Sequence, residues 1–351
     1  MSLRLYVDAS RWHTHLKAVV EAHPGIVPVA KGNGYGFGVP RLAEETASLG
    51  LGMLAVGTYG EVGAASRIGG GPFDGSVMVL APWRPFDSAA VYAEQVVHTV
   101  GRLADLRDLA SRGDRPRVVL ERMTSMRRHG FSARELWAAA QGVAGDAGVR
   151  VEGVAFHLPM GQGSHLTEAH RLMTDVVAAG LETRTVFVSH LTDAELHALA
   201  AAYPDYELRP RIGTALWLGD RGALRVRATV LDTHPVERGD IFGYRGRTAP
   251  KHGTILVVSG GTAHGIGLEA PTGGATLRDR AVRIARGGLD AAGFVRSPYT
   301  IGGKQRLFAE PPHMQASMLF LPAGARVPEV GEEVDVRVRF TTTTFDETVL
   351  G

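Results

Sequence analysis

The amino-acid sequence predicts an α/β barrel of the (β/α)8 TIM type, followed by a C-terminal antiparallel β domain. Up to about residue 220, eight short apolar runs alternate with segments of helical periodicity. Beyond that point the helical period mostly disappears, and alternating, β-rich runs replace it. The length of 351 residues exceeds the usual size of a single core, so a large barrel with a smaller second domain is expected.

The apolar runs are the predicted barrel strands, and most of them precede a helix-like stretch. The runs cover residues 25–31, 52–57, 77–82, 96–101, 117–123, 151–158, 185–191 and 206–213. The helices predicted between them cover residues 40–50, 61–69, 88–94, 103–113, 133–148, 167–180 and 193–204. This regular alternation favours a closed parallel barrel over an open doubly wound sheet.

The β-rich runs predict where the second domain begins. They cover residues 224–236, 253–261, 316–324 and 332–345. Residues 278–288 are an exception, because their pattern is helical. We therefore place the barrel at residues 8–222 and the β domain at residues 223–351, with residues 1–7 as a candidate addition to the β domain.

Composition excludes several classes of function. The chain is 44% hydrophobic and 21% charged, as in an ordinary soluble globular protein. Lys and Arg number 38 against 36 Asp and Glu, and no long basic block with interleaved aromatics occurs, so we expect no nucleic-acid partner. The absence of cysteine excludes disulfides, thiolate metal sites and a cysteine nucleophile, and we expect no metal. Neither a secretory signal nor a membrane-spanning run is present, so we expect a cytoplasmic protein.

The segment "VPVAKGNGYGFG" places Lys31 at the end of the first barrel strand. Barrel chemistry gathers where strands end and the following loops begin. The glycines of residues 32–38 let the backbone approach a ligand closely, while Asn33 and Tyr35 add polar ends. Lysine amines that form Schiff bases with pyridoxal phosphate need such a crowded, partly desolvated site. We therefore interpret Lys31 as the residue that carries a cofactor.

At these residues the chain resembles the alanine racemase family, pyridoxal-phosphate enzymes of fold type III that pair a barrel with a C-terminal β domain. "VAKGNGYGFG" resembles the cofactor-lysine motif of that family. Similar segments occur in the family's order over nearly the whole chain: "LYVDASRWHTHL", "VEGVAFHL", "RPRIGTALWLG" and "GDIFGYRGR". The cofactor implied by the resemblance is pyridoxal 5'-phosphate.

The resemblance also implies two opposed bases. Lys31 would hold the cofactor and act on one face of the substrate α-carbon, while Tyr244 matches the family tyrosine that acts on the other face from the partner subunit. His157 matches the histidine that the family places near this tyrosine, and Arg211 matches the arginine facing the pyridine nitrogen. Because a guanidinium keeps its proton, the ring nitrogen would stay unprotonated and side reactions such as transamination would be suppressed.

The phosphate is expected on the turn before the eighth barrel helix. Gly213 and Thr214 would supply backbone donors there, and Tyr35 would donate from its hydroxyl. His190 stands where the family usually has the serine of an Asn-Ser pair, so Ser189 or His190 is expected to contact the phosphate.

Substrate recognition is assigned in the same way. Arg128 matches an arginine that contacts the cofactor phenol oxygen and the substrate carboxylate, and Met314 matches a methionine whose backbone faces that carboxylate. Glu121 stands where many members carry a carbamylated lysine, and it keeps the negative charge available to Arg128. Ser259 and Gln315 depart from the family's usual aromatic residue and aspartate, and the last residues lack a phosphate-binding tyrosine. A substrate larger than alanine is compatible with these losses.

Each of these residues has a simpler interpretation when it is taken alone. Lys31, Arg128 and Arg211 can be ordinary cations with solvated heads, and Tyr244 and His157 can be core side chains with satisfied polar atoms. We prefer the functional interpretation because the matching segments follow one another in family order.

The sequence therefore predicts an amino-acid racemase, acting on alanine or a larger amino acid in a head-to-tail homodimer with shared active sites. The alternative is a non-catalytic or repurposed pyridoxal-phosphate-binding protein linked to cell-wall synthesis. Related decarboxylases present an acid to the pyridine nitrogen and use a cysteine, and a barrel-only homeostasis protein has no β domain. Zinc-assisted dehydratases are disfavoured by the lack of cysteine, although "AHGIG" and "PPHM" leave a histidine-only site open.

Overall fold

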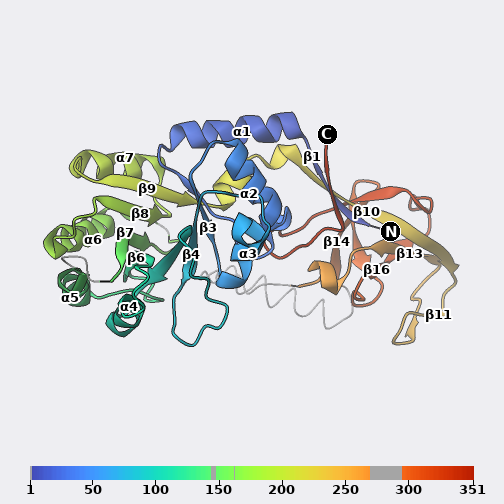
Figure 1. The fold of residues 1–351 in the computed structure, drawn as a ribbon. Helices are drawn as coiled ribbons and strands as arrows, with labels where there is room; N and C mark the ends of the chain where they lie inside the picture. Colours follow the sequence, from blue (N-terminus) through green and yellow to red (C-terminus); the bar gives the residue numbers. More distant parts are fainter. Residues whose placement is uncertain (1, 144–147, 162, 269–294) are drawn as a thin grey trace. The chain divides into compact units, whose positions relative to one another are not determined.

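The computed structural model describes residues 2–143, 148–161, 163–268 and 295–351 (Figure 1). The chain forms two compact units, each of which is described by itself. We call Thr14–Gly34 together with Gly38–Gly219 the barrel unit. We call Met1–His13, Tyr35–Phe37 and Asp220–Gly351 the β unit. The helix predicted over residues 278–288 lies outside the described residues.

The barrel unit is built on eight parallel strands among the described residues. In sheet order they are β2 (Val27–Pro28), β9 (Glu207–Ile212), β8 (Thr185–Ser189), β7 (Arg150–His157), β6 (Arg117–Arg122), β5 (Val96–Val100), β4 (Ser76–Pro82) and β3 (Met53–Val56). A parallel bridge between Val29 and Ala55 joins the two ends of this sheet. The sheet is thus nearly closed, and the predicted fold class is confirmed.

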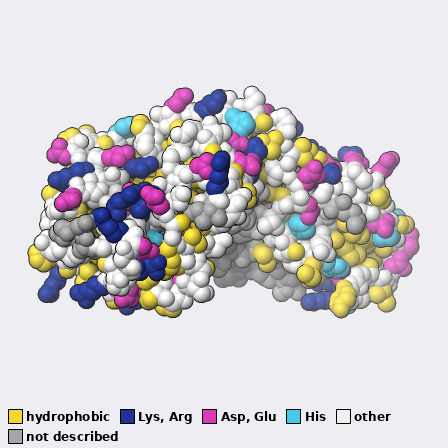
Figure 2. Space-filling view, viewed as in Figure 1, with side chains coloured by type: hydrophobic (Ala, Val, Ile, Leu, Met, Phe, Trp, Pro, Cys, Tyr) yellow, Lys and Arg dark blue, Asp and Glu magenta, His cyan; other side chains and the backbone are white. Residues whose placement is uncertain are grey.

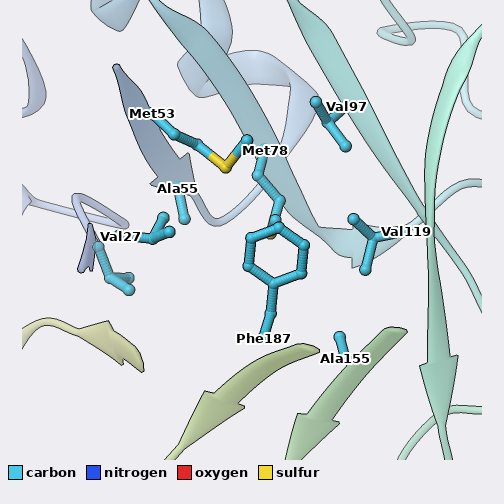
Figure 3. Close-up of a cluster of buried hydrophobic side chains, with 9 residues drawn as sticks. Val27, Met53, Ala55, Met78, Val97, Val119, Ala155 and Phe187 are labelled. Carbon is cyan, nitrogen blue, oxygen red and sulfur yellow. The ribbon is translucent and has the colours of Figure 1, made fainter. Parts of the chain in front are cut away.

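Apolar side chains that alternate along the strands fill the inside of the barrel (Figure 3). They are Val27, Val29, Met53, Ala55, Met78, Val97, Val119, Ala155 and Phe187. The Phe187 ring lies beside Met78 among the smaller Ala and Val side chains, which is the mixture of large and small residues that fills a barrel interior (Figure 3). The barrel is therefore a packed core, and any ligand must bind at one of its ends.

Helices follow most of the strands. They are α1 (Ala9–Ala22), α2 (Val39–Ser48), α3 (Val62–Ala65), α4 (Leu103–Ala110), α5 (Ala133–Val143), α6 (Leu166–Ala179), α7 (Asp193–Ala202) and α8 (Thr214–Leu218), with the 3₁₀ turns η1 (Gly34–Gly36) and η2 (Tyr59–Glu61). Amphipathic patterns explain the longer ones: in α6 the residues Leu172, Met173 and Val176 are buried. A capping box between Thr192 and Glu195 begins α7.

The helix predicted over residues 88–94 is wrong, because that segment is irregular in the structure. Tertiary contacts hold its central tyrosine instead. The Tyr92 hydroxyl accepts a hydrogen bond from Trp83 Nε1 at 3.0 Å, and the Arg112 guanidinium carbon lies 3.4 Å from the centre of the Tyr92 ring. Contacts to residues on both sides of the segment thus override its local helical pattern.

The β unit contains a closed ring of six strands among the described residues. Their order is β10 (Leu224–Val236), β13 (Gly253–Ser259), β16 (Ala316–Pro322), β15 (Lys304–Phe308), β14 (Arg296–Ile301) and β17 (Glu333–Val336), and β17 pairs with β10 again. Neighbouring strands in the ring are antiparallel, as predicted. The strands β1 (Leu3–Val7) and β18 (Glu347–Leu350) extend the sheet beyond β10, and β1 pairs with β18 in parallel.

Candidate active site

A cavity of about 260 Å³ lies at the carboxyl end of the barrel strands. Its lining residues are Lys31, Gly57, Leu80, Ala81, Pro82, Glu121, Arg128, His129, His157 and Arg211. They come from the ends of β2, β3, β4, β6, β7 and β9 and from the loop after β6. Parallel barrels place their chemistry at this end. Four of the predicted site residues, Lys31, Arg128, His157 and Arg211, are thus brought together.

Lys31 lies three residues after β2 and is positioned by closure of the sheet. The Ala30 amide donates to the Ala55 carbonyl at 2.8 Å, which fixes the backbone just before the lysine. Partial burial of the amine lowers the pKa of Lys31, and the nearby Arg128 and Arg211 cations lower it further. A lysine with a lowered pKa has more of its amine in the free, nucleophilic form at neutral pH.

Arg211 lies near the end of β9 and is almost completely buried. Its Nε donates to Ser189 Oγ at 3.1 Å, and its Nη2 donates to the Phe156 carbonyl at 2.8 Å. Burial lowers the pKa of Arg211 to about 10, which still leaves the guanidinium charged at neutral pH. The predicted Ser189 therefore contacts Arg211 and helps to hold it at the cavity.

Glu121 is the buried acid of the cavity and lies near the end of β6. Burial raises its pKa, while Arg211 and Arg128 act in the opposite direction. Within the described part of the chain, no hydrogen bond or ion pair joins Glu121 to Arg128, so the expected direct pairing is replaced by a longer-range attraction. The Arg128 guanidinium has no hydrogen-bond or ion-pair partner among the described residues, which leaves its donors open to an anion.

Two histidines from neighbouring strands meet beside the cavity. The rings of His157, at the end of β7, and His190, after β8, have centroids 5.0 Å apart. His190 Nδ1 donates to the Leu158 carbonyl at 2.7 Å. Burial, followed by Arg211 and Arg128, lowers the pKa of His157 to about 3, and burial also lowers the pKa of His190. Both imidazoles are neutral at physiological pH.

Sequence reasoning missed His129, which lines the cavity next to Arg128. Burial and the neighbouring Arg128 and Arg84 lower its pKa, so it too is neutral at physiological pH. The feature of the sequence that could have indicated His129 is its position in "RRHG", directly after the assigned arginine.

Gly213, Thr214 and Tyr35 are not among the cavity residues. Gly213 is the residue before α8, and Thr214 is the first residue of that helix, two and three positions after Arg211. Tyr35 is a buried residue of the β unit with a left-handed backbone, at φ 55°. The assignment of these three residues to the phosphate stays a prediction.

Tyr244 and Met314 belong to the β unit, and both are exposed there. Tyr244 lies in the hairpin between β11 (Ile241–Phe242) and β12 (Arg247–Thr248), and its backbone amide donates to the two carboxylate oxygens of Glu310 at 2.9 and 3.2 Å. Glu310 is buried and also accepts from His313 Nε2 at 2.6 Å. A Cβ at Gly243, which has a φ of 73°, would collide with this carboxylate. The side chain of Tyr244 itself is 91% exposed.

Ser259, which we matched to an aromatic residue at the active-site entrance, is buried inside the β unit. Its hydroxyl donates to the Ser2 carbonyl at 2.7 Å and accepts from the Thr229 amide at 2.8 Å. Its hydroxyl thus links β13 to β10 and to the residue before β1, and the expected effect of this serine on the active-site entrance stays a prediction.

A larger cavity of about 390 Å³ lies at the opposite, amino end of β5, β6 and β7. Two of its cations are already paired, because Arg117 and Arg150 both contact Glu152, at 2.8 and 2.7 Å. It contains none of the predicted site residues. We therefore take the smaller cavity as the candidate active site, because its lysine amine and the Arg128 guanidinium have no hydrogen-bond or ion-pair partner among the described residues.

One buried histidine beside the larger cavity makes the stability of the barrel unit depend on pH. His98 is 1% exposed, and its Nδ1 is 2.6 Å from the Tyr59 hydroxyl. Burial lowers the pKa of His98 to about 4, against about 6.5 in the unfolded chain. Between these values the unfolded state binds more protons, so stability is complete above pH 6.5 and falls as the pH drops toward 4.

We expect His98→Gln to weaken this pH dependence. From this residue alone the wild-type free energy of unfolding should fall by roughly 1 kcal/mol per pH unit in that window. Urea unfolding at pH 7 and pH 5 measures the difference for each protein, so that any constant cost of the substitution cancels. Equal losses in wild type and His98→Gln would contradict the assignment.

Three further observations concern surface charge, membrane-spanning helices and metal sites. On the face shown in Figure 2, Lys and Arg side chains lie among Asp and Glu side chains and form no single continuous basic area. Among the described residues, no helix is long and apolar enough to cross a membrane. In the same part of the chain, no group of three or more His, Cys, Asp or Glu residues is placed to hold a metal ion.

Comparison with known proteins supports the predicted resemblance to alanine racemases over most of the chain. A family model described as the N-terminal domain of alanine racemase matches residues 7–219. The alanine racemase of Mycolicibacterium vanbaalenii is 29% identical over 280 residues, which are 72% of this chain and 70% of that protein. The alanine racemase of Nitratidesulfovibrio vulgaris is 29% identical over 259 residues, 68% of each protein.

Solved structures share the fold at lower identity. The alanine racemase of Bartonella henselae, with covalently bound pyridoxal phosphate, covers 100% of both chains with a TM-score of 0.73 and 15% identity. That of Bacillus anthracis, with bound L-Ala-P, covers 99% of this chain and 87% of its own, with a TM-score of 0.72 and 19% identity. At these identities the likeness concerns the fold alone.

Proposed function

The chain belongs to the alanine racemase family, and on this basis we propose that it is a pyridoxal-phosphate-dependent amino-acid racemase. One observation carries the proposal beyond family membership. The cavity at the carboxyl end of the barrel brings a partly desolvated lysine amine together with two arginines. We propose residues 8–222 as the cofactor-binding domain and residues 223–351, with residues 1–7, as the β domain.

The residues of the cavity fit the cofactor. Arg128 and Arg211 provide two guanidinium cations against the single lining acid Glu121, and this surplus suits an anionic ligand. The free amine of Lys31 suits an aldehyde, since its pKa is lowered. Lys31 would carry the cofactor, Arg211 would face its ring nitrogen, and Tyr35, Ser189, His190, Gly213 and Thr214 would surround its phosphate.

When bound, pyridoxal phosphate supplies the electron sink that makes the α-proton of an amino acid removable. The protein contributes the two proton-transfer groups. The Lys31 amine would accept or return a proton at Nζ on one face of the substrate, and the Tyr244 phenol would do the same on the other. His157 and His190 are neutral, so they can accept hydrogen bonds near Lys31 without adding charge.

Arg128 would bind the substrate carboxylate, together with the Met314 backbone. Its guanidinium is exposed and free among the described residues, as a substrate-binding arginine must be before substrate arrives. Leu80 and Pro82 add apolar surface to the same cavity, which suits an uncharged substrate side chain. We propose alanine or a larger amino acid as the substrate.

An exchange experiment tests this function. The purified chain with pyridoxal phosphate is incubated with each common amino acid in heavy water, and loss of the α-proton signal is followed by NMR together with the appearance of the other enantiomer. We expect exchange with inversion for at least one amino acid. Cofactor binding without exchange for any of them would instead favour a non-catalytic cofactor-binding protein, and absence of both would refute the two functions.

We propose that each active site is shared between two subunits of a head-to-tail homodimer. Lys31 lies in the barrel unit and Tyr244 in the β unit, where the phenol is almost fully exposed and held at the tip of a short hairpin. In an equal mixture of Lys31→Ala and Tyr244→Phe subunits, about half of the dimers formed at random are mixed, and each mixed dimer has one intact site of two. The mixture should therefore regain about a quarter of the wild-type activity. Failure to regain activity after proven subunit exchange would contradict shared sites.

A further inference from the structure

The carboxylate of Glu61 joins two strand ends at the mouth of the barrel. Glu61 is the last residue of η2, which follows β3. Its Oε2 accepts a hydrogen bond from the Gly57 amide at 2.7 Å, and its Oε1 accepts one from the Gly32 amide at 3.1 Å. Gly32 is the residue directly after Lys31. One side chain therefore ties the backbone next to the lysine to the end of the neighbouring strand.

The packing around this carboxylate leaves little space for a side chain at position 57. A Cβ at Gly57 would lie 3.1 Å from the Lys31 Cβ and 3.1 Å from Glu61 Oε2. Both distances are shorter than ordinary carbon contacts. The glycine thus lets the lysine stem and the carboxylate pack against the same piece of backbone, and Lys31, Gly57 and Glu61 form one close group.

Charged groups from several elements act on the Lys31 amine. Arg128, from the loop after β6, and Arg211, from β9, lower the pKa of Lys31, and Glu61 raises it. His157 and His190, from the ends of β7 and β8, also interact with the lysine, and Glu121 of β6 lines the same cavity. Glu61, which follows β3, is thus the acid whose charge opposes the effect of the two arginines on the Lys31 pKa.

We propose that Glu61 is a positioning residue for Lys31. Its two amide hydrogen bonds fix the backbone beside the lysine, and its negative charge opposes the two arginines on the other strands. The importance of this arrangement rests on the proposed function, because a lysine that must accept a proton needs a basic amine. Without Glu61 the amine would be less basic and its backbone less constrained.

The protonation of Lys31 can be measured in the full chain without cofactor. A limiting amount of acetic anhydride labels free amines in proportion to their unprotonated fraction, and mass spectrometry quantifies each lysine separately. The exposed residues Lys17, Lys251 and Lys304 serve as internal references. Because this readout needs no turnover, it gives a result whether or not the chain proves to be a racemase.

In Glu61→Gln we expect the labelling curve of Lys31 to move to lower pH. At a pH below the wild-type midpoint, Lys31 should be labelled about two- to fivefold faster relative to the three reference lysines. Glu182→Gln is the matched control, since this exposed glutamate precedes β8 at the amino end of the strands, and it should leave the curve unchanged. An unchanged Lys31 curve in Glu61→Gln would overturn the proposal and leave the racemase assignment standing.

Glu61→Asp separates the charge from the hydrogen bonds and is available if Glu61→Gln does not fold. Its side chain is one methylene shorter, so it keeps the charge but cannot span the Gly32 and Gly57 amides. Hydrogen exchange should show at least one of these amides losing protection, while the Lys31 labelling midpoint stays close to that of wild type. Unchanged protection of both amides would overturn the positioning role.

Discussion

Replacing Lys31 with alanine is expected to remove α-proton exchange, with a loss of about 10²–10⁴-fold or more. The variant lacks both the amine that would carry the cofactor and the base on one face of the substrate. Its exchange rate is measured by NMR in heavy water with the best wild-type substrate, and cofactor binding is measured by absorbance before and after borohydride. Lys17→Ala removes an exposed lysine of α1 and should leave both readouts unchanged.

A second substitution makes this result specific to the amine. Lys31→Arg keeps a positive charge at the end of β2, but a guanidinium stays protonated and does not form the covalent bond. It should therefore be as inactive as Lys31→Ala, and borohydride should fix no cofactor to it. Exchange near the wild-type rate in either variant would show that Lys31 is not the essential group.

Arg211→Leu is expected to lower the free energy of unfolding of the barrel unit by about 3–5 kcal/mol. The substitution leaves the Phe156 carbonyl without the donor that now lies 2.8 Å away. It also removes a cation that compensates Glu121, which is only 5% exposed. Urea unfolding measures the loss, and Arg67→Leu, at an exposed ion pair with Asp74, should change stability by less than about 1 kcal/mol.

The double variant Arg211→Leu with Glu121→Leu tests the electrostatic part of this loss. Once the buried acid is gone, the missing cation matters less, so the double variant should recover a large part of the stability lost in Arg211→Leu. Strictly additive losses would contradict an interaction between Glu121 and Arg211. The cycle needs no cofactor, because it concerns the folded chain alone.

Periodicity was sufficient to predict the barrel. Each of the eight apolar runs overlaps a strand of the nearly closed sheet, because strands buried on both faces are nearly continuous in apolar residues. Residues 88–94 failed because their helical pattern is local, whereas Trp83 and Arg112 hold Tyr92 from outside the segment. In the β unit, the run over residues 332–345 is a strand only at Glu333–Val336, and the short strands β14 and β15 were missed.

The candidate site was predicted through the strand ends. Lys31, His157 and Arg211 each lie at the carboxyl end of a barrel strand, where parallel strands bring their last residues together. Glu61 was missed because nothing in its own sequence neighbourhood indicates the lysine beside which it lies. His129 was missed although it follows the assigned arginine, because its position in the sequence does not show that its side chain lines the cavity. Their place depends on how separate strand ends meet in the closed sheet, which no single segment encodes.

The placement of β1 has a consequence for how this protein is made. Leu3–Val7 pairs with β10 on one side and with β18, at Glu347–Leu350, on the other. During translation, the second of these neighbours leaves the ribosome more than 300 residues after the first strand, so the β unit cannot be completed until residues 347–350 have been synthesised. The barrel strands, all encoded before residue 213, have no such delay. A nascent chain should therefore acquire protease resistance in the barrel first, before β1 has paired with β10 and β18.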